Sequence, residues 1–312
     1  MRRSYVARRI VFALLVVVGV TLVTFVLMHV VPGDPARAVL GEHATPAAVA
    51  ALRRQWDLGE PLPQQLGHFV VGLMTLRLGD SYFYKTPVAS LIGDRIGLTA
   101  ALVALATVFA VVIAVPLATV AAARRDRAAD HATRAVTVAG LGMPSFWFGI
   151  VLIEIFALRL HVLPVGGDGT GLGGGLQSLI LPSVTAALAI VPLLVRSLRV
   201  GMIEVLDSDY VATARAKGLR EPRVLIRHAA RNAVIPTVTL LGLNIAYLVG
   251  STVVVEQVFA LNGLGSLLLD SIVNRDFPVV QAITLVLAAS VVIINLLTDL
   301  LAARLDPRIR LR

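Results

Sequence analysis

The sequence predicts an all-α, polytopic membrane protein, and three observations lead to that class. Of the 312 residues, 57% are hydrophobic and only 15% are charged, and the mean hydropathy is +0.85. A soluble domain of this size would carry more charge. The apolar residues gather in runs of about 20, which is the length at which a helix crosses the hydrocarbon of a bilayer. The arginines behind the net charge of +9 lie beside these runs and not in one domain with aromatic residues, which favours membrane flanks over nucleic acid.

Six stretches are long and apolar enough to span a membrane. They are residues 10–31, 98–121, 136–158, 177–195, 235–258 and 279–303. The first follows four arginines and so resembles a secretory signal peptide. It is longer than a signal core, and no small-x-small cleavage site precedes Pro32. We therefore expect a retained anchor, and a single transmembrane domain over residues 1–312.

The distribution of basic residues predicts the orientation of these spans. One side would hold segments 1–9, 122–134, 196–234 and 304–312, and the other 31–97, 159–176 and 259–278. The first set carries 20 lysines and arginines and the second carries eight, six of them in the long first loop. Basic residues favour the cytoplasmic side, and long loops count little. Both termini and the segment 196–234 are therefore predicted to be cytoplasmic.

The extracytoplasmic loop 32–97 has helical signals of its own. Thr45 and Pro46 match a helix cap followed by proline at the first helical position. A second amphipathic stretch starts at Pro63 and carries apolar residues up to Met74, before Gly79. The two helices could receive a delivering protein, or could simply seal the bundle, and both alternatives stay open.

The cytoplasmic segment 196–234 predicts a short polar helix over residues 209–217. Asp207 and Ser208 can cap free N–H groups at its start, and Gly218 can take the left-handed turn that ends it. A slim helix rich in alanine fits a groove on another protein. The alternative is a solvated loop with a few charges.

Two prolines lie between this helix and the fifth span. Pro222 suits the first position of a second short helix, over residues 222–233. Pro236 lacks a backbone donor, so the fifth span is expected to bend or to begin there.

The residues of this segment resemble the cytoplasmic signature loop of binding-protein-dependent ABC importer permeases. Ala212, Thr213 and Ala214 stand where that signature has an acidic residue and two alanines, and Gly218 is its glycine. The acidic first residue is absent, and Arg231 replaces a common proline. These departures are similar to the dipeptide, oligopeptide and nickel branch. Further similarities to that branch, in chain order, are found at 22–35, 78–81, 144–147, 163–164, 181–182, 262–265, 275–278 and 305–308.

The resemblance implies a type I ABC importer permease with six transmembrane helices and cytoplasmic termini, a multi-pass protein of the bacterial cytoplasmic membrane. It implies that the signature helix docks on an ATPase. The docking residues would be Asp209, Tyr210, Ala212, Thr213, Ala214, Lys217 and Gly218. The implied partners are a second homologous permease in a heterodimer, two cytoplasmic ATPase subunits or domains, an extracytoplasmic substrate-binding protein and membrane lipid, with no nucleic acid. The implied substrates are di- or oligopeptides, with glutathione or nickel as alternatives.

Motifs for catalysis are missing from the sequence, so the chain is expected not to be an enzyme. No G-x-x-x-x-G-K-[ST] loop occurs, and the glycine-rich run Gly166 to Gly175 has no following lysine, which favours a flexible outer turn. ATP and Mg²⁺ would therefore bind partner subunits, and this chain would hold no cofactor. The six histidines show no metal-ligand spacing, and without cysteine no thiolate site can form. We expect no metal site.

Polar groups inside spans are candidates for the translocation path, because burying them in lipid is costly. Asn244, Thr252 and Glu256 are spaced by eight and four residues, so they could share one helix face. They could line a water-filled pathway or pack between helices. Glu154 is close enough to the outer end of its span to reach water.

A different class of protein, the ion-coupled secondary transporter that acts alone, is the competing interpretation. It would need midplane carboxylates or matching broken helices in two halves of the chain. The sequence shows neither clearly, and the signature loop would then have no explanation.

Overall fold

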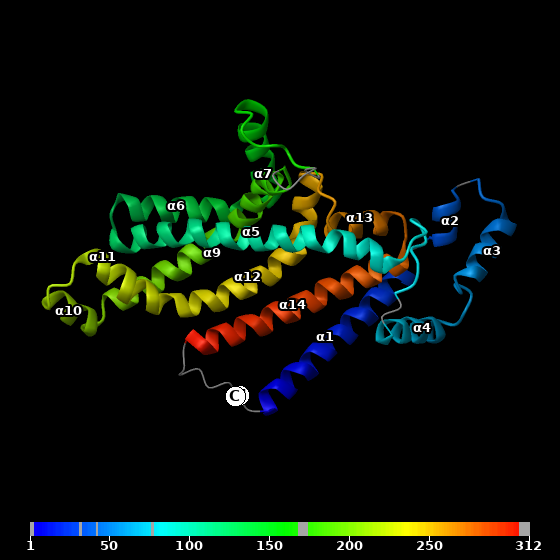
Figure 1. Cartoon of the computed structure of the whole chain (residues 1–312), viewed down its shortest axis with the longest axis horizontal. Coiled ribbons are helices and arrows are strands. Elements are labelled where there is room, and N and C mark those ends of the chain that lie inside the picture. The colour runs from blue at the N-terminus through cyan, green and yellow to red at the C-terminus, as the bar shows by residue number, and fades with distance from the viewer. Residues whose placement is uncertain (1–2, 31–32, 42, 76–77, 168–173, 306–312) are drawn as a thin grey trace. The chain divides into compact units, whose positions relative to one another are not determined.

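The computed structural model describes residues 3–30, 33–41, 43–75, 78–167 and 174–305 (Figure 1). The chain divides into two compact units. Unit 1 comprises residues 1–6, 100–261 and 291–312, and unit 2 comprises residues 7–99 and 262–290. Most described residues are helical, and the sole β pairing among them is an isolated bridge between Asp80 and Pro87.

Each unit consists of helices, and three helices contribute to both. The shared helices are α1 (Arg3–Val30), α5 (Val88–Ala123) and α14 (Phe277–Leu305). Unit 1 adds α6 (Ala128–Gly142), α7 (Ser145–Leu152), the π-helix η1 (Ile153–Arg159), α8 (Gly174–Ser178), α9 (Ile180–Leu206), α10 (Asp209–Ala216), α11 (Glu221–Arg223), the π-helix η2 (Val224–Ala230) and α12 (Arg231–Val258). Unit 2 adds α2 (Pro35–Leu40), α3 (Pro46–Gln55), α4 (Leu62–Met74) and α13 (Leu264–Val273).

Helix α9 is the central helix of unit 1. It packs against α6, α7, α12 and η2, and 72% of its most apolar window is buried, against 33% for the other long helices. Small residues allow these close approaches, as they do between helices in lipid. A side chain at Gly201 of α9 would stand 3.2 Å from Ala233 at the start of α12.

The predicted third span, 136–158, is wrong as a single helix. The chain instead forms α6 and then α7 with η1, and these two parts are bent by 106°. The break falls at Met143, whose φ of −98° and ψ of 132° are extended, and Pro144 precedes α7. Proline disfavours the helical conformation of the residue before it, so this break follows from the sequence although the apolar run conceals it.

The expected separate helix over residues 222–233 is also wrong. Helices α11, η2 and α12 form one continuous helix from Glu221 to Val258. Pro236 lies inside α12 and does not begin it. A proline removes one hydrogen bond, whereas ending the helix there would expose several backbone groups to an apolar surrounding.

Four described helices are long and apolar enough to cross a membrane, or five if the bent pair counts as one span. They contain the predicted spans at 98–121, 177–195, 235–258 and 279–303, together with the broken one. The remaining prediction, 10–31, falls in α1, whose described apolar stretch is Leu15–Leu27. Side chains on both sides of that stretch lie outside the described residues, so the length of this span stays a prediction.

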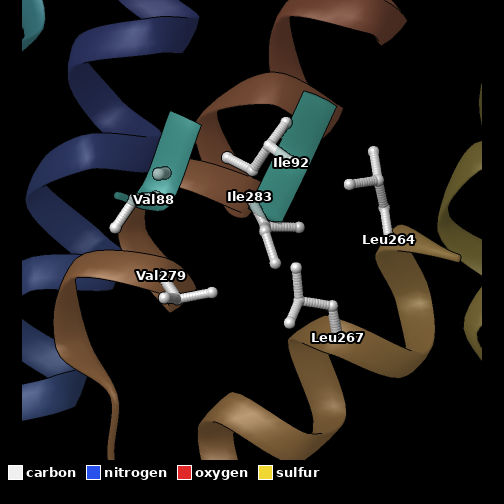
Figure 2. Packing of buried hydrophobic residues seen from close by; sticks show 7 residues of the cluster. Val88, Ile92, Leu264, Leu267, Val279 and Ile283 are labelled. Atoms are coloured by element: carbon white, nitrogen blue, oxygen red, sulfur yellow. The ribbon is translucent and has the colours of Figure 1, made fainter. Parts of the chain in front are cut away.

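The core of unit 2 lies where the first turns of α5 and α14 meet α13. Figure 2 shows these three helices directing aliphatic side chains toward one another. The cluster comprises Val88 and Ile92 of α5, Leu264 and Leu267 of α13, and Val279, Ala282 and Ile283 of α14. Helix α13 lies in a segment that the sequence indicated only as a connection.

Two segments far apart in the sequence are joined beside this core by Asp276. Its side chain, which is fully buried, accepts hydrogen bonds from the backbone N–H groups of Tyr82 and Phe83 at 3.1 Å each. The hydroxyl of Ser81 donates to the same carboxylate. The turn before α14 therefore holds the loop between α4 and α5 in place.

The two helices predicted in the loop 32–97 are present, and the cap and proline expected at the start of the first are found there. The Thr45 hydroxyl accepts a hydrogen bond from the Ala48 N–H at 3.3 Å, and Pro46 occupies the first helical position of α3. Helix α4 covers the second amphipathic stretch. Most of the glycine-rich run lies outside the described residues, at 168–173, but Gly166 packs so closely on the carbonyl oxygen of Phe259 that a Cβ would overlap it.

Candidate functional site

The short polar helix predicted over residues 209–217 is present as α10, between the long helices α9 and α11–α12 (Figure 1). Its end is a Schellman motif. The Leu219 N–H donates to the Ala214 carbonyl at 3.2 Å, and the Gly218 N–H donates to the Arg215 carbonyl at 2.9 Å. Gly218 has a φ of +82°, so the left-handed turn expected of this glycine is confirmed.

The expected side-chain caps at the start of this helix are wrong. Ser208 stands at the N-cap, but its side chain makes no capping hydrogen bond and donates instead to the Val205 carbonyl at 2.5 Å. Asp207 ends α9 and forms an ion pair with Arg125 at 2.8 Å. Both side chains make contacts around the turn that follows α9 and therefore do not cap α10. The sequence did not indicate these contacts.

Helix α10 has an inner and an outer face. Val211 is 0% exposed and Ala214 is 9% exposed, so these two residues pack toward the chain. The opposite face consists of Asp209, Ala212, Thr213 and Ala216, all exposed and spaced as one side of a helix. We call this set the outer face of α10.

This geometry separates the seven predicted docking residues. Ala214, at one of the two alanine positions of the signature, faces inward, so its smallness is explained by packing within the chain, against the expectation that it is presented to a partner. Asp209, Ala212 and Thr213 lie on the outer face, and Lys217 and Gly218 are exposed at its end.

Polar contacts tie α10 to its neighbours. The guanidinium of Arg215 donates two hydrogen bonds to the Glu221 carboxylate, at 2.6 and 3.2 Å, and a third to the Leu206 carbonyl at 3.4 Å. The Tyr210 hydroxyl accepts a hydrogen bond from the Asn232 amide at 2.8 Å. Together with its packing on α9 and η2, these contacts connect α10 to the ends of both long helices.

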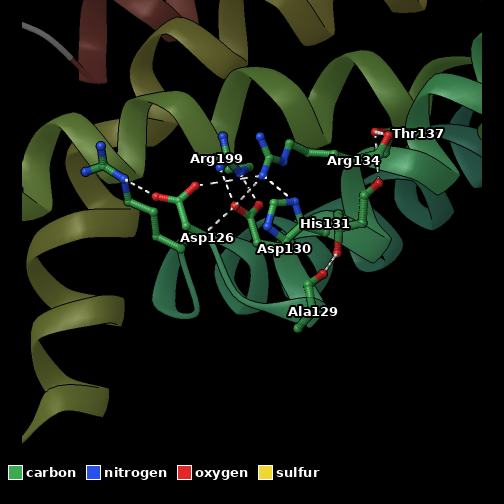
Figure 3. A network of polar contacts seen from close by, with 9 residues as sticks. Asp126, Ala129, Asp130, His131, Arg134, Thr137 and Arg199 are labelled. Atoms are coloured by element: carbon green, nitrogen blue, oxygen red, sulfur yellow. Dashed lines mark hydrogen bonds and ion pairs between the residues drawn. The ribbon is translucent and has the colours of Figure 1, made fainter.

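A buried ion pair joins α6 to α9, and Figure 3 shows Asp130 and Arg199 facing each other. The Arg199 guanidinium donates two hydrogen bonds of 2.6 Å to the two oxygens of Asp130. Asp130 is fully buried, and it also accepts a 3.0 Å hydrogen bond from the Asp126 N–H. In the sequence, nothing signals this pair beyond one acidic residue in the first turn of an amphipathic helix.

The polar residues of α12 lie in the packed interior of the chain. Asn244, Thr252 and Glu256 are 6%, 1% and 0% exposed, so they do share a buried face. Asn244 and Thr252 donate to carbonyls of their own helix, those of Leu240 and Val249. This burial favours packing between helices over a water-filled pathway, and the pathway assignment stays a prediction.

Glu154 lies at the surface of η1. Its carboxylate is half-exposed and accepts a 2.9 Å hydrogen bond from Arg159. This geometry agrees with a side chain that reaches water, because the carboxylate and its partner are both exposed.

The fold defines the class of protein: long apolar helices, one of them broken, with a short polar helix held between two of them, make a polytopic helical membrane protein. Residues 114–311 match the model of the family "binding-protein-dependent transport system inner membrane component". Residues 1–103 match its N-terminal companion. The chain belongs to this family and is the permease component of an ABC importer, a protein of the bacterial inner membrane.

Similar proteins match over almost the full length. The chain is 38% identical to a glutathione transport system permease protein, GsiC, of Pectobacterium atrosepticum over 307 residues, which is 98% of this chain and 99% of the relative. It is 37% identical over 308 residues to the proteins of the same name in Escherichia coli K12 and Shigella dysenteriae, with the same coverage.

Proposed function

We propose that this chain is the membrane-spanning subunit of an ATP-driven importer of short peptides, and that glutathione is among its substrates. It would act by alternating access, beside a second permease, with an extracytoplasmic binding protein that delivers the substrate. Two observations support the substrate class. The motifs resemble the peptide branch, and the relatives that match over 98% of the chain are named glutathione permeases.

The observation that carries the proposed mechanism is the outer face of α10. Asp209, Ala212, Thr213 and Ala216 expose short side chains on a helix that is anchored from its other side. A groove on a cytoplasmic ATPase can approach such a helix closely. ATP and Mg²⁺ would bind that ATPase, and this chain would hold neither.

The contacts of α10 supply a mechanical route into the membrane. A push on the outer face would reach α9 through Leu206 and α11–α12 through Glu221, because Arg215 contacts both. Val211 and Ala214 would carry the same motion through packing. The work of this subunit is therefore mechanical, and the chemistry of hydrolysis belongs to its partner.

Arginine substitutions on the outer face test this mechanism. Ala212→Arg and Ala216→Arg each place a long, charged side chain there and leave the inner face unchanged. We expect normal insertion, but loss of ATPase co-purification and at least a tenfold fall in ATP-dependent uptake, because a charge buried without a partner disrupts an interface. Ala128→Arg, at an exposed helical position of α6, is the matched control and should leave both intact. Normal co-purification with both outer-face variants would contradict docking through α10.

Competition for uptake tests the substrate class. Labelled glutathione should enter in an ATP-dependent manner, and unlabelled dipeptides should compete with it, whereas nickel should not. Uptake that stops when the ion gradient collapses but continues without ATP hydrolysis would instead indicate a secondary transporter.

A further inference from the structure

Unit 2 contains a cavity that the proposed mechanism does not use. Its volume is about 330 Å³, within the usual range for small-molecule sites. The cavity is lined by α1, the turn after α3, α4, the loop before α5 and the first turn of α14. By the predicted orientation this loop and these short helices are extracytoplasmic.

Two acidic groups line the cavity without a partner among the described residues. Asp57 and Asp80 line it, both are exposed, and neither side chain makes a hydrogen bond or ion pair with any described residue. Two other carboxylates of unit 2 contact basic side chains, since Asp34 lies 3.4 Å from Arg53 and Glu60 lies 3.3 Å from His68. Asp57 and Asp80 therefore give the cavity a negative end suited to a cation.

Asp57 also has an unusual backbone. It has a φ of +53° and occupies the position after α3 where glycine is usual. Its backbone N–H donates to the Arg54 carbonyl, and the N–H of Leu58 donates to the Arg53 carbonyl. Asparagine accepts this left-handed conformation as readily as aspartate does. An Asp57→Asn substitution therefore removes the charge without disturbing the turn.

A buried amide points to a polar ligand as well. Gln281 of α14 is 8% exposed and lines the cavity, and its side chain makes no hydrogen bond with any described residue. The amide can therefore donate to or accept from a polar group of a ligand in the cavity. His29, by contrast, has both ring nitrogens engaged, with the Phe25 carbonyl at 2.8 Å and Gln65 at 3.1 Å.

Aromatic side chains form a wall of the cavity. Trp56 stacks on Tyr82 with the ring centroids 4.0 Å apart and the planes 10° from parallel. Phe25, Phe69 and Phe277 also line it. Aromatic faces attract cations and accept apolar side chains. Carboxylates, a free amide and aromatic surface together suit a small ligand with an ammonium group, a hydrogen-bonding backbone and an apolar body.

We propose that this cavity binds the amino-terminal end of a short peptide, with its ammonium group at Asp57 and Asp80, its backbone at Gln281 and its first side chain against the aromatic wall. The inference that the ligand is a peptide rests on the proposed function. The cavity would then be a selectivity site, which favours peptides with a free amino terminus.

The two tryptophans of the chain make a direct test possible. Trp147→Phe leaves Trp56, in the wall of the cavity, as the sole tryptophan. Leucyl-leucine is titrated into this full-length variant in lipid nanodiscs, and the fluorescence of Trp56 is followed. We expect a saturable change with leucyl-leucine and none with N-acetyl-leucyl-leucine. Asp57→Asn and Asp80→Asn should each raise the Kd about tenfold, whereas Asp94→Asn, a carboxylate of α5 outside the cavity, should not change it.

Three results would overturn the proposal: no saturable change, an equal response to the acetylated peptide, or an unchanged Kd in both cavity variants with intact melting curves. ATP-dependent uptake of the same peptide, measured separately, distinguishes the two proposals. Uptake without a Trp56 response contradicts the cavity site alone. A charge-dependent Trp56 response without ATP-dependent uptake contradicts the proposed function and supports an amine site.

Discussion

At the scale of single residues, the Asp130–Arg199 ion pair of unit 1 carries a desolvation cost, because both charged groups are removed from water when the protein folds. The Arg199 side chain is 15% exposed and Asp130 is 0% exposed. Such a pair is held by its two short hydrogen bonds, and either partner alone would be a buried charge.

Removing Asp130 should therefore destabilise the protein. We expect Asp130→Ala to lower the free energy of unfolding by about 3–5 kcal/mol, measured by thermal unfolding of the purified protein. Asp207→Ala, which breaks the exposed pair with Arg125, is the control and should change stability by less than about 1 kcal/mol. An effect of Asp130→Ala as small as that of the control would show that the pair contributes little.

Tyr82 allows a prediction about pH. Burial, with the nearby charges of Asp276 and Asp57, raises the pKa of its phenol to about 12. The neutral phenol is favoured by folding, so its contribution to stability is complete below the unfolded pKa of 10.0 and is lost as the pH rises toward 12. In an alkaline titration followed by tyrosinate absorbance, Tyr82→Phe should remove the latest of the tyrosine transitions. Loss of an early transition instead would contradict the burial of this phenol.

The residues that sequence patterns predicted are those whose roles are local. Gly218 and Thr45 act on their own helix ends, and both are found as expected. Asp130 and Arg199 lie 69 positions apart, and Ser81 and Asp276 lie 195 apart, so only the fold brings them together. Ala214 shows why a small residue is hard to interpret from the sequence: it fits the interior of its own chain as well as a groove on a partner.

At the scale of elements, glycines determine how closely the helices of unit 1 can approach. A Cβ at Gly242 of α12 would overlap the side chain of Thr298 on α14, whereas one at Gly250 on the same helix would meet nothing within 4 Å. Small residues at such contacts allow van der Waals packing that larger ones prevent.

The two glycines form a matched pair for substitution. Gly242→Ala should destabilise the protein by about 1–3 kcal/mol through overpacking. Gly250→Ala should be neutral or stabilising by up to about 1 kcal/mol, since alanine favours a helix. Thermal unfolding of both variants provides the comparison. Equal melting temperatures would mean that α12 and α14 do not pack as described.

Helix existence was predictable at this scale, but helix ends were not. Apolar length located most of the long helices. The apolar run concealed the extended Met143 before Pro144. The missing backbone donor of Pro236 led us to expect a bend or a start there, although the helix begins before it and continues through it. The same residue type stands at the break before α7 and inside α12, so its presence alone does not locate a helix end.

At the scale of the whole molecule, the predicted orientation follows from the charge distribution. Topology reporters fused to the chain should therefore give different signals on the two sides of the membrane. A fusion after Thr86 should behave as extracytoplasmic, and an insertion near Arg220, which is exposed after α10, should behave as cytoplasmic. Alkaline phosphatase and a cytoplasmic fluorescent protein are suitable reporters. Finding both positions on one side would contradict the six-span arrangement.

The central claim is that the outer face of α10 receives the ATPase, and the absence of cysteine from the sequence allows the most direct test. Single cysteines at Ala212, Thr213 and Ala216 are labelled with a membrane-impermeant thiol reagent in inside-out vesicles, with and without the assembled ATPase. The ATPase should protect all three positions at least tenfold, and should leave a cysteine at Ala128 unprotected. Equal labelling rates with and without the ATPase at the three outer-face positions would contradict the claim.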